Sequence, residues 1–226
     1  MSRQHTFPFH EVLVCIVVAA MAGILSDNAS PAVPIPDESM MKIACKDRET
    51  LRKGRRSANR HMERMRNLGY DTLIVRNCIP SGMDWRLIAS VIFQESGFSA
   101  PESATGQKYH GLMQISPEAA RIFGMDEDDL RSPDCNIEAG SRYLRHLMDI
   151  FTKEGLDSTN AVKYALASYN CGIGRIQKIR DSASAHGINT DRWEDFEELF
   201  SNSEGPTRKY VSEITDRYEN LKKYIK

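Results

Sequence analysis

The sequence predicts an all-α protein. Apolar residues recur at the three- and four-residue spacing of an amphipathic helix in several segments. No segment alternates apolar and polar residues for long, and neither Asn-Gly nor Asp-Gly, the common signs of a tight β-hairpin, occurs in the chain. The 226 residues are enough for one domain with a sizeable core and additional segments.

The N-terminus predicts an exported protein. Residues 12–25 (VLVCIVVAAMAGIL) carry no charge. This run is short for a membrane span, which needs about 20 residues, and suits a signal peptide or, alternatively, a signal anchor. Cys15 follows a valine and lies too early for a lipoprotein signal. We expect residues 1–26 to direct export and the polar, proline-rich residues 27–37 to form an extended linker.

Residues 38–69 predict a basic helical segment. Between Lys42 and Arg66 there are ten Lys or Arg residues against three Asp or Glu, although the whole chain has a net charge of −1. The overall balance gives no indication of nucleic-acid binding. The basic segment is either a solvated helix face or a surface that docks on an anionic envelope polymer or on lipid headgroups.

The stretch DWRLIASVIFQESGF predicts a helix that ends at a carboxylate. Asp84 can cap it, and it runs to Gln94 or Glu95. One apolar face is formed by Trp85, Ile88, Ala89, Ile92 and Phe93. A glutamate at the end of an apolar stripe costs free energy unless it is paired, exposed or used in chemistry.

The rest of the chain predicts further helices. Ser116 is a good N-cap, Pro117 fits the first helical position, and Gly124 ends that helix. From residue 137 onward a third apolar stripe contains Tyr143, Leu144, Leu147, Met148 and Phe151. Gly140 on this stripe would let a neighbouring helix approach closely. A short apolar helix over 161–168 follows. The last helix is amphipathic, with apolar positions at Tyr210, Val211, Ile214, Tyr218 and Leu221.

Four short stretches form a specific set by their order and separation. They are QESGF (94–98), GLMQISPEAA (111–120), NIEAGSRYL (136–144) and ALASYNCGIG (165–174). Together they resemble the catalytic domain of lytic transglycosylases, lysozyme-like enzymes that cut bacterial peptidoglycan, and in particular membrane-bound lytic transglycosylase F and the soluble lytic transglycosylases. The resemblance covers about residues 70–224 and leaves out the basic segment. It implies a lysozyme-like (goose-type) helical catalytic domain over 70–226.

The resemblance implies that Glu95 is the catalytic acid/base. The physical chemistry agrees, because a carboxyl held against Ile92 and Phe93 is disfavoured as the anion and its pKa should rise. A raised pKa keeps a proton available near neutral pH, which protonation of a glycosidic oxygen requires. The alternative is a helix-terminal glutamate that faces solvent.

Other roles are also implied by the resemblance. Tyr169 matches a tyrosine whose hydroxyl reaches the catalytic glutamate and orients it, and Asn170 would fix the loop around the cleft. Met113 and Gln114 would line the cleft, where an amide can bind an N-acetyl group or a sugar hydroxyl. The alternatives are a core tyrosine for Tyr169 and a purely structural turn around Met113.

Ser103 matches a serine that points at the scissile region, although the intervening loop departs from the family pattern. Ser103 lies eight residues after Glu95 instead of the usual nine, and the approach over 106–111 is about two residues longer. Tyr109 and His110 either add sugar contacts or form a surface bulge. Ser116 also replaces an apolar residue common in the family.

The implied reaction uses one glutamate. Glu102 and Glu118 are the carboxylates nearest to Glu95 in sequence, and neither lies where the resemblance would place a second catalytic group. Glu95 would protonate the oxygen between N-acetylmuramic acid and N-acetylglucosamine, then deprotonate the muramoyl 6-hydroxyl to close a 1,6-anhydro ring. No metal or organic cofactor is expected. The alternatives are a lysozyme-type hydrolase of the same fold and a non-catalytic glycan-binding protein.

The expected partner is the peptidoglycan glycan strand. We expect no nucleic acid, a monomer, and association with a membrane only through the N-terminal segment. The protein would act in the periplasm, either free or anchored to the inner membrane and facing the periplasm.

Four cysteines remain outside the exported segment, namely Cys45, Cys78, Cys135 and Cys171. An even number in an oxidising compartment is consistent with two disulfides in any of three connectivities. A metal site is the alternative, without support from any Cys-x-x-Cys pair. Because some small lytic transglycosylases resemble this arrangement, we expect a Cys78–Cys135 bridge, with Cys45 and Cys171 as a second pair or as free thiols.

Overall fold

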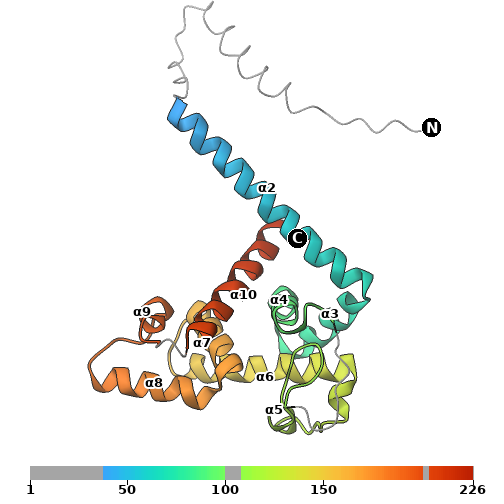
Figure 1. Cartoon of the computed structure of the whole chain (residues 1–226). Helices are drawn as coiled ribbons and strands as arrows, with labels where there is room; N and C mark the ends of the chain where they lie inside the picture. The colour runs from blue at the N-terminus through green and yellow to red at the C-terminus, as the bar shows by residue number, and fades with distance from the viewer. Residues whose placement is uncertain (1–37, 100–107, 201–203, 226) are drawn as a thin grey trace, which may run out of the picture. The chain divides into compact units, whose positions relative to one another are not determined.

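The computed structural model of the chain describes residues 38–99, 108–200 and 204–225. Within these ranges all regular structure is helical, apart from one isolated antiparallel bridge between His110 and Ile115 (Figure 1). The elements are α2 (Glu38–Asn67), α3 (Tyr70–Ser81), α4 (Trp85–Ser96), α5 (Pro117–Arg121), the 3₁₀ helix η2 (Asp129–Arg131), α6 (Pro133–Lys153), α7 (Ser158–Cys171), α8 (Ile173–Ala185), α9 (Trp193–Glu197) and α10 (Gly205–Tyr224). The predicted all-α class is confirmed.

The chain divides into two compact units, residues 1–51 and residues 52–226. The described part of the first unit, residues 38–51, consists of the beginning of α2. In the second unit α6 runs between α3 and α7 and contacts both of them (Figure 1). Helix α4 packs against α3 and α10. The second unit therefore holds every element that bears on the candidate site.

Helix α4 begins as the sequence predicts. The side chain of Asp84 accepts a hydrogen bond from the backbone nitrogen of Arg86 at 2.9 Å, as an N-cap does. The buried surface of α4 is wider than the single apolar face that the sequence predicts. Six consecutive residues are buried, namely Leu87, Ile88, Ala89, Ser90, Val91 and Ile92. A helix buried on all sides needs neighbours on all sides. Since α4 is packed in this way, a polar group at its end is also partly removed from water.

One buried amide fixes the turn that contains the Gly-Leu-Met motif. The Asn136 side chain donates to the carbonyls of His110 (2.8 Å) and Leu130 (3.1 Å) and accepts from the backbone nitrogen of Met113 (2.9 Å). Gly111 has φ +68°, and a Cβ there would lie 2.3 Å from the amide nitrogen of Asn136. Only glycine therefore fits at this position.

Gly140 allows the same turn to lie directly on α6. A Cβ at Gly140 would lie 2.5 Å from the sulfur of Met113, whose side chain is fully buried. The predicted close approach at Gly140 is thus confirmed, although the approaching element is a turn and not a helix.

The predicted Cys78–Cys135 disulfide is wrong, because both residues are free thiols in the structure. Helices α3 and α6 do meet here, since the amide of Asn77 donates to Asp134 at 2.8 Å. Cys78 lies in the core and is only 3% exposed, whereas Cys135 is half-buried. Burial raises the pKa of the Cys78 thiol to about 12. The side chain of Cys45 lies outside the described residues, and Cys171 is also a free thiol.

The described part of the chain has neither a membrane-spanning helix nor a cluster of metal ligands. No helix in it is both long enough and apolar enough to span a bilayer. The same residues contain no group of three or more His, Cys, Asp or Glu side chains that could hold a metal ion. The expected export segment (1–26) and linker (27–37) lie outside the described residues.

We expect Asn136→Ala to lower the free energy of unfolding by about 2–4 kcal/mol, since it removes three buried hydrogen bonds to backbone groups, although the His110 carbonyl still accepts from the backbone N–H of Ile115. Denaturant unfolding followed by circular dichroism measures this loss. Arg145→Ala is the matched control on the same helix, because Arg145 forms only a surface pair with Asp149. A loss at Asn136 no larger than that of the control would contradict the role given to its amide.

Candidate active site

Glu95 lies in the last turn of α4 and is half-buried. Burial raises the pKa of its carboxyl from 4.5 to about 7. The hydroxyl of Tyr210, on α10, donates a hydrogen bond to Oε1 of Glu95 at 2.5 Å, and this bond acts in the opposite direction by stabilising the anion. At neutral pH the carboxyl is therefore balanced between its protonated and ionised forms.

Tyr210 is the residue that sequence reasoning missed. The sequence placed it among the apolar positions of the last helix, with no chemical role. It is indeed buried, but a buried tyrosine hydroxyl needs a hydrogen-bond partner, and here the partner is Glu95. The only sequence signal was this general need of a buried tyrosine, which does not say which partner is used.

Tyr169 lies near Glu95 but makes its hydrogen bond elsewhere. Its hydroxyl donates to the backbone carbonyl of Met113 at 2.9 Å, whereas the expected partner was Glu95. Its ring packs against that of Tyr143, with 5.7 Å between the centroids. Burial raises the pKa of Tyr169 well above its usual value, and the charge of Glu95 raises it further. The structure thus brings Tyr169 within electrostatic influence of the carboxyl and joins it to the Gly-Leu-Met turn.

The residues after Glu95 explain why the helix stops there. Ser96 donates to the carbonyl of Leu112 at 2.8 Å, and so ties the end of α4 to the Gly-Leu-Met turn. Gly97 adopts φ +58° and donates its backbone N–H to the carbonyl of Phe93, which is a left-handed helix end. The Ser-Gly pair therefore fixes the turn next to the carboxylate.

Met113 and Gln114, which were expected to line the cleft, differ in burial. The side chain of Met113 is fully buried against α6, and only its carbonyl takes part in the site by accepting from Tyr169. Gln114 is half-buried and has the unusual φ of +46°. Its amide nitrogen donates to the carbonyl of Gly111 at 2.8 Å, so this group is used within the turn.

Asn170 joins the end of α7 to the start of α10. Its side-chain oxygen accepts from the hydroxyl of Thr207 at 2.7 Å. Since Thr207 lies one turn before Tyr210, this bond fixes the end of the helix that carries the tyrosine. Asn170 is therefore bonded to α10, the helix that carries Tyr210, and its expected role at the loop around the cleft stays a prediction.

The loop expected to be remodelled is described only in part. Ser103 lies outside the described residues. Tyr109 is 44% exposed and His110 is 1% exposed. His110 lies 3.8 Å from the carboxylate of Glu127. Of the two residues suggested as sugar contacts, only Tyr109 is available at the surface.

A polar clamp sets the position of α10 on α4. The amide of Gln94 donates to Glu213 at 2.9 Å and accepts from Arg217 at 3.2 Å. Arg217 also donates to the carbonyl of Ser90 at 3.2 Å, and its guanidinium lies 4.5 Å from the centre of the Phe93 ring. Because Tyr210 is on the same helix as Arg217, the clamp determines where the tyrosine meets Glu95.

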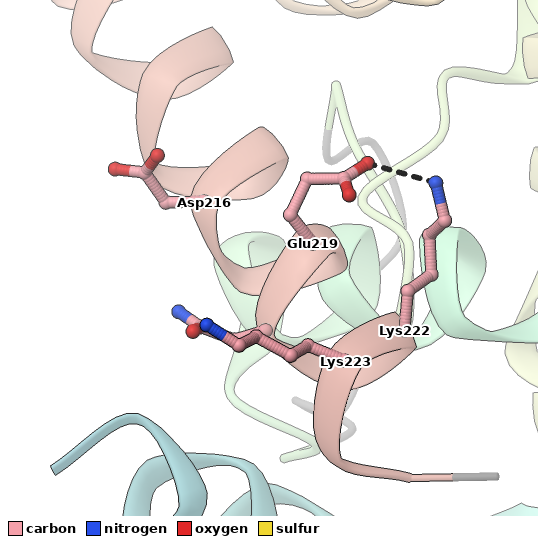
Figure 2. A pocket seen from close by; sticks show the side chains of 5 residues that line it. Asp216, Glu219, Lys222 and Lys223 are labelled. Carbon is pink, nitrogen blue, oxygen red and sulfur yellow. Dashed lines mark hydrogen bonds and ion pairs between the residues drawn. The ribbon is translucent and has the colours of Figure 1, made fainter. Parts of the chain in front are cut away.

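A shallow polar pocket on α10 is separate from this site. Figure 2 shows the side chains that line it, Asp216, Glu219, Asn220, Lys222 and Lys223. Glu219 and Lys222 point toward each other and form an ion pair at 3.0 Å, whereas Asp216 points away from them. All five residues belong to the second half of α10, and Glu95 is not among them.

The fold is that of a lytic transglycosylase domain. The structure is similar to that of the lytic transglycosylase Slt from Pseudomonas aeruginosa, solved as an inactive mutant, with a TM-score of 0.53 and 24% identity over 69% of this chain and 24% of that chain. Residues 77–191 match the model of the transglycosylase SLT domain family. The chain belongs to this family.

Curated relatives agree with this assignment. The chain is 28% identical over 154 residues to membrane-bound lytic murein transglycosylase F of Aeromonas salmonicida (strain A449), covering 62% of this chain and 30% of the relative. It is 32% identical over 153 residues to that of Marinobacter nauticus, with the same two coverages. It is 38% identical over 120 residues to that of Desulfosudis oleivorans, covering 52% and 25%. The chain thus spans less than a third of the length of these relatives.

We expect Tyr210→Phe to raise the pKa of Glu95 further above 7, because it removes a hydrogen bond that stabilises the carboxylate. Titration of the Glu95 carboxyl by ¹³C NMR measures the change. Tyr169→Phe is the matched control, since its hydroxyl bonds to Met113, and it should move the pKa less. A pKa that stays the same or falls in the Tyr210 variant would show that this bond does not stabilise the anion.

The raised pKa of Glu95 also predicts a pH-dependent stability. Well below pH 4.5 the carboxyl is protonated in both the folded and the unfolded chain. Between pH 4.5 and about 7 the folded chain keeps the proton that the unfolded chain loses, so the free energy of unfolding falls as the pH rises through this window. Above this pH window the folded chain carries the full cost of burying an ionised carboxylate, about 1–3 kcal/mol for a half-buried group.

Glu95→Gln removes this penalty. Relative to the wild type, the variant should gain about 1–3 kcal/mol of stability between pH 4 and pH 8, measured by denaturant unfolding at a series of pH values. Glu118→Gln is the control, because Glu118 is exposed and its pKa is lowered by hydrogen bonds. A difference between Glu95→Gln and the wild type that does not change with pH would rule out a raised pKa.

Proposed function

We propose that the protein is a peptidoglycan lytic transglycosylase, which cleaves the β-1,4 bond between N-acetylmuramic acid and N-acetylglucosamine and leaves 1,6-anhydromuramoyl ends. The observation that carries this proposal is Glu95, a half-buried carboxyl with a pKa raised to about 7 in a chain of the SLT family. A group that titrates near neutral pH can give a proton in one step and take one in the next. The names of the curated relatives support the same activity.

In the first step protonated Glu95 donates its proton to the glycosidic oxygen as the bond to the muramoyl C1 breaks. The substrate's own N-acetyl group stabilises the oxocarbenium-like centre. In the second step ionised Glu95 accepts the proton of the muramoyl 6-hydroxyl, whose oxygen bonds to C1 and closes the anhydro ring. The hydrogen bond from Tyr210 stabilises the anion that exists between these steps.

The surroundings of Glu95 favour a single catalytic carboxylate. Two-carboxylate glycosidases hold the second group about 5–9.5 Å from the first. Among the described residues no other carboxylate influences the pKa of Glu95, which is set by burial and by Tyr210. Glu118 is exposed on α5, and Glu102 lies outside the described residues. The causes of the pKa shift of Glu95 and the exposure of Glu118 support transglycosylation over two-carboxylate hydrolysis.

The other site residues are proposed to act around this carboxyl. Tyr169 would orient the Gly-Leu-Met turn against Glu95, and Asn170 would fix the helix that carries Tyr210. Gln114 would contact the sugar, while Met113 contributes through its backbone carbonyl. Ser103 would point at the scissile bond from the loop outside the described residues.

The remaining proposals concern the organisation of the chain. We place the catalytic domain at residues 70–226, the basic helical segment at 38–69, the linker at 27–37 and the export segment at 1–26. The protein would act on glycan strands as a monomer on the periplasmic side of the inner membrane, either released or held by its N-terminal segment. The membrane-bound relatives support an envelope location.

Glu95→Gln should abolish release of 1,6-anhydromuropeptides from purified sacculi, because the amide can neither give nor take the proton. Mass spectrometry of the soluble products measures the release and separates the anhydro product from a hydrolysis product, which is heavier by one water. Glu118→Gln is the matched control and should retain activity. Residual activity above a few per cent in the Glu95 variant would exclude Glu95 as the acid/base. If the wild type released hydrolysis products, the protein would be a lysozyme-type hydrolase. If the wild type released no product, the remaining alternative would be a non-catalytic glycan-binding protein.

A further inference from the structure

Four arginines form a stripe along α2. They are spaced by four residues, so successive members lie one turn apart on one side of the helix. All four are exposed, and all belong to the second unit together with the candidate site. The members of this arginine stripe are Arg52, Arg56, Arg60 and Arg64. The residues of α2 that face the core are different ones, Ala58, Met62 and Met65.

In the described part of the chain, no ion pair neutralises the charge of the arginine stripe. Among the described residues none of the four arginines forms an ion pair with a carboxylate, and Glu63 is the only acidic residue between positions 52 and 67. Like charges four residues apart on a helix repel each other. An exposed arrangement of this kind costs free energy in the isolated protein and gains it when an anion binds.

The stripe reaches the turn that ends the catalytic helix. Arg64 donates to the hydroxyl of Ser99 at 3.4 Å, and Ser99 is four residues beyond Glu95. A cavity of about 540 Å³ lies at this junction, and its lining includes Arg60, Arg64, Phe98 and Ser99. The positive surface is therefore continuous with the chain segment that follows Glu95.

We propose that the arginine stripe binds the carboxylates of the peptides attached to the glycan strand whose sugars reach Glu95. This proposal rests on the proposed function. Guanidinium groups bind carboxylates through paired hydrogen bonds. Twelve residues of helix separate Arg52 from Arg64, which gives a stripe of about 18 Å at 1.5 Å per residue. An extended peptide of about five residues has the same length.

The contact between Arg64 and Ser99 favours this ligand over a lipid surface. A glycan at Glu95 brings its own peptides to neighbouring parts of the protein, and the stripe begins at the adjacent turn. A membrane-binding surface would have no reason to continue into the turn after the catalytic helix.

The test measures binding of the Glu95→Gln protein to sacculi that carry their peptides and to glycan strands from which an amidase has removed them. In this background the combined change Arg56→Gln, Arg60→Gln and Arg64→Gln should weaken binding to peptide-bearing sacculi about tenfold at low ionic strength, with a smaller loss at high salt. Binding to the peptide-free strands should not change. The corresponding triple change to Lys keeps the charge but loses the paired hydrogen bonds, and should restore only part of the binding.

The matched control neutralises three exposed basic residues on other helices, with Arg121→Gln, Lys153→Gln and Lys178→Gln. It should bind like the parent protein. Equal loss on both substrates, equal loss in the control, or no loss at all would overturn the proposal. Loss of binding to vesicles of anionic phospholipid without loss on sacculi would overturn it in favour of a lipid surface. Failure of the wild type to release anhydromuropeptides would overturn the proposed function, whereas the binding comparison would still decide the role of the stripe.

Discussion

The chemistry of this protein depends on the packing of α4 against α10, because that contact keeps the carboxyl of Glu95 partly out of water. Burial alone would hold the proton too firmly, and the hydrogen bond from Tyr210 opposes it, so the pKa comes to about 7. The clamp formed by Gln94 and Arg217 holds the two helices in the register that makes this balance possible. Two opposing effects on one group thus define the site.

The Gly-Leu-Met turn next to Glu95 is held in place by the side chains of three helices. Asn136 fixes the Gly-Leu-Met turn from α6, Ser96 ties the same turn to the end of α4, and Tyr169 ties it to α7. Each of these polar groups is buried or half-buried and has its hydrogen-bond partner, so the turn is rigid at little cost. The Gly-Leu-Met turn beside Glu95 is therefore held by α4, α6 and α7 together.

The protein uses charge in two contrasting ways. At Glu95 a single carboxyl is partly withdrawn from solvent, and burial raises its pKa to about 7. The four arginines of the stripe on α2 are exposed, and their summed positive field is the property that a polyanion would meet. Elsewhere most surface charges pair locally, as Arg142 does with Glu138 and Lys222 with Glu219. The exposed arginines of α2 stand apart from this pattern.

The sequence by itself determined the helices, the cap at Asp84 and the carboxylate at the end of α4, because periodicity and capping depend on residues within a few positions of each other. Only the tertiary structure decided which side chains meet. Tyr210 bonds to Glu95 from 115 residues away, and Tyr169 bonds to a backbone carbonyl instead. Cys78 points into the core and stays a free thiol although its helix contacts the helix of the expected partner. Such contacts depend on how distant helices are rotated against one another, and that rotation is set by the packing of the whole core.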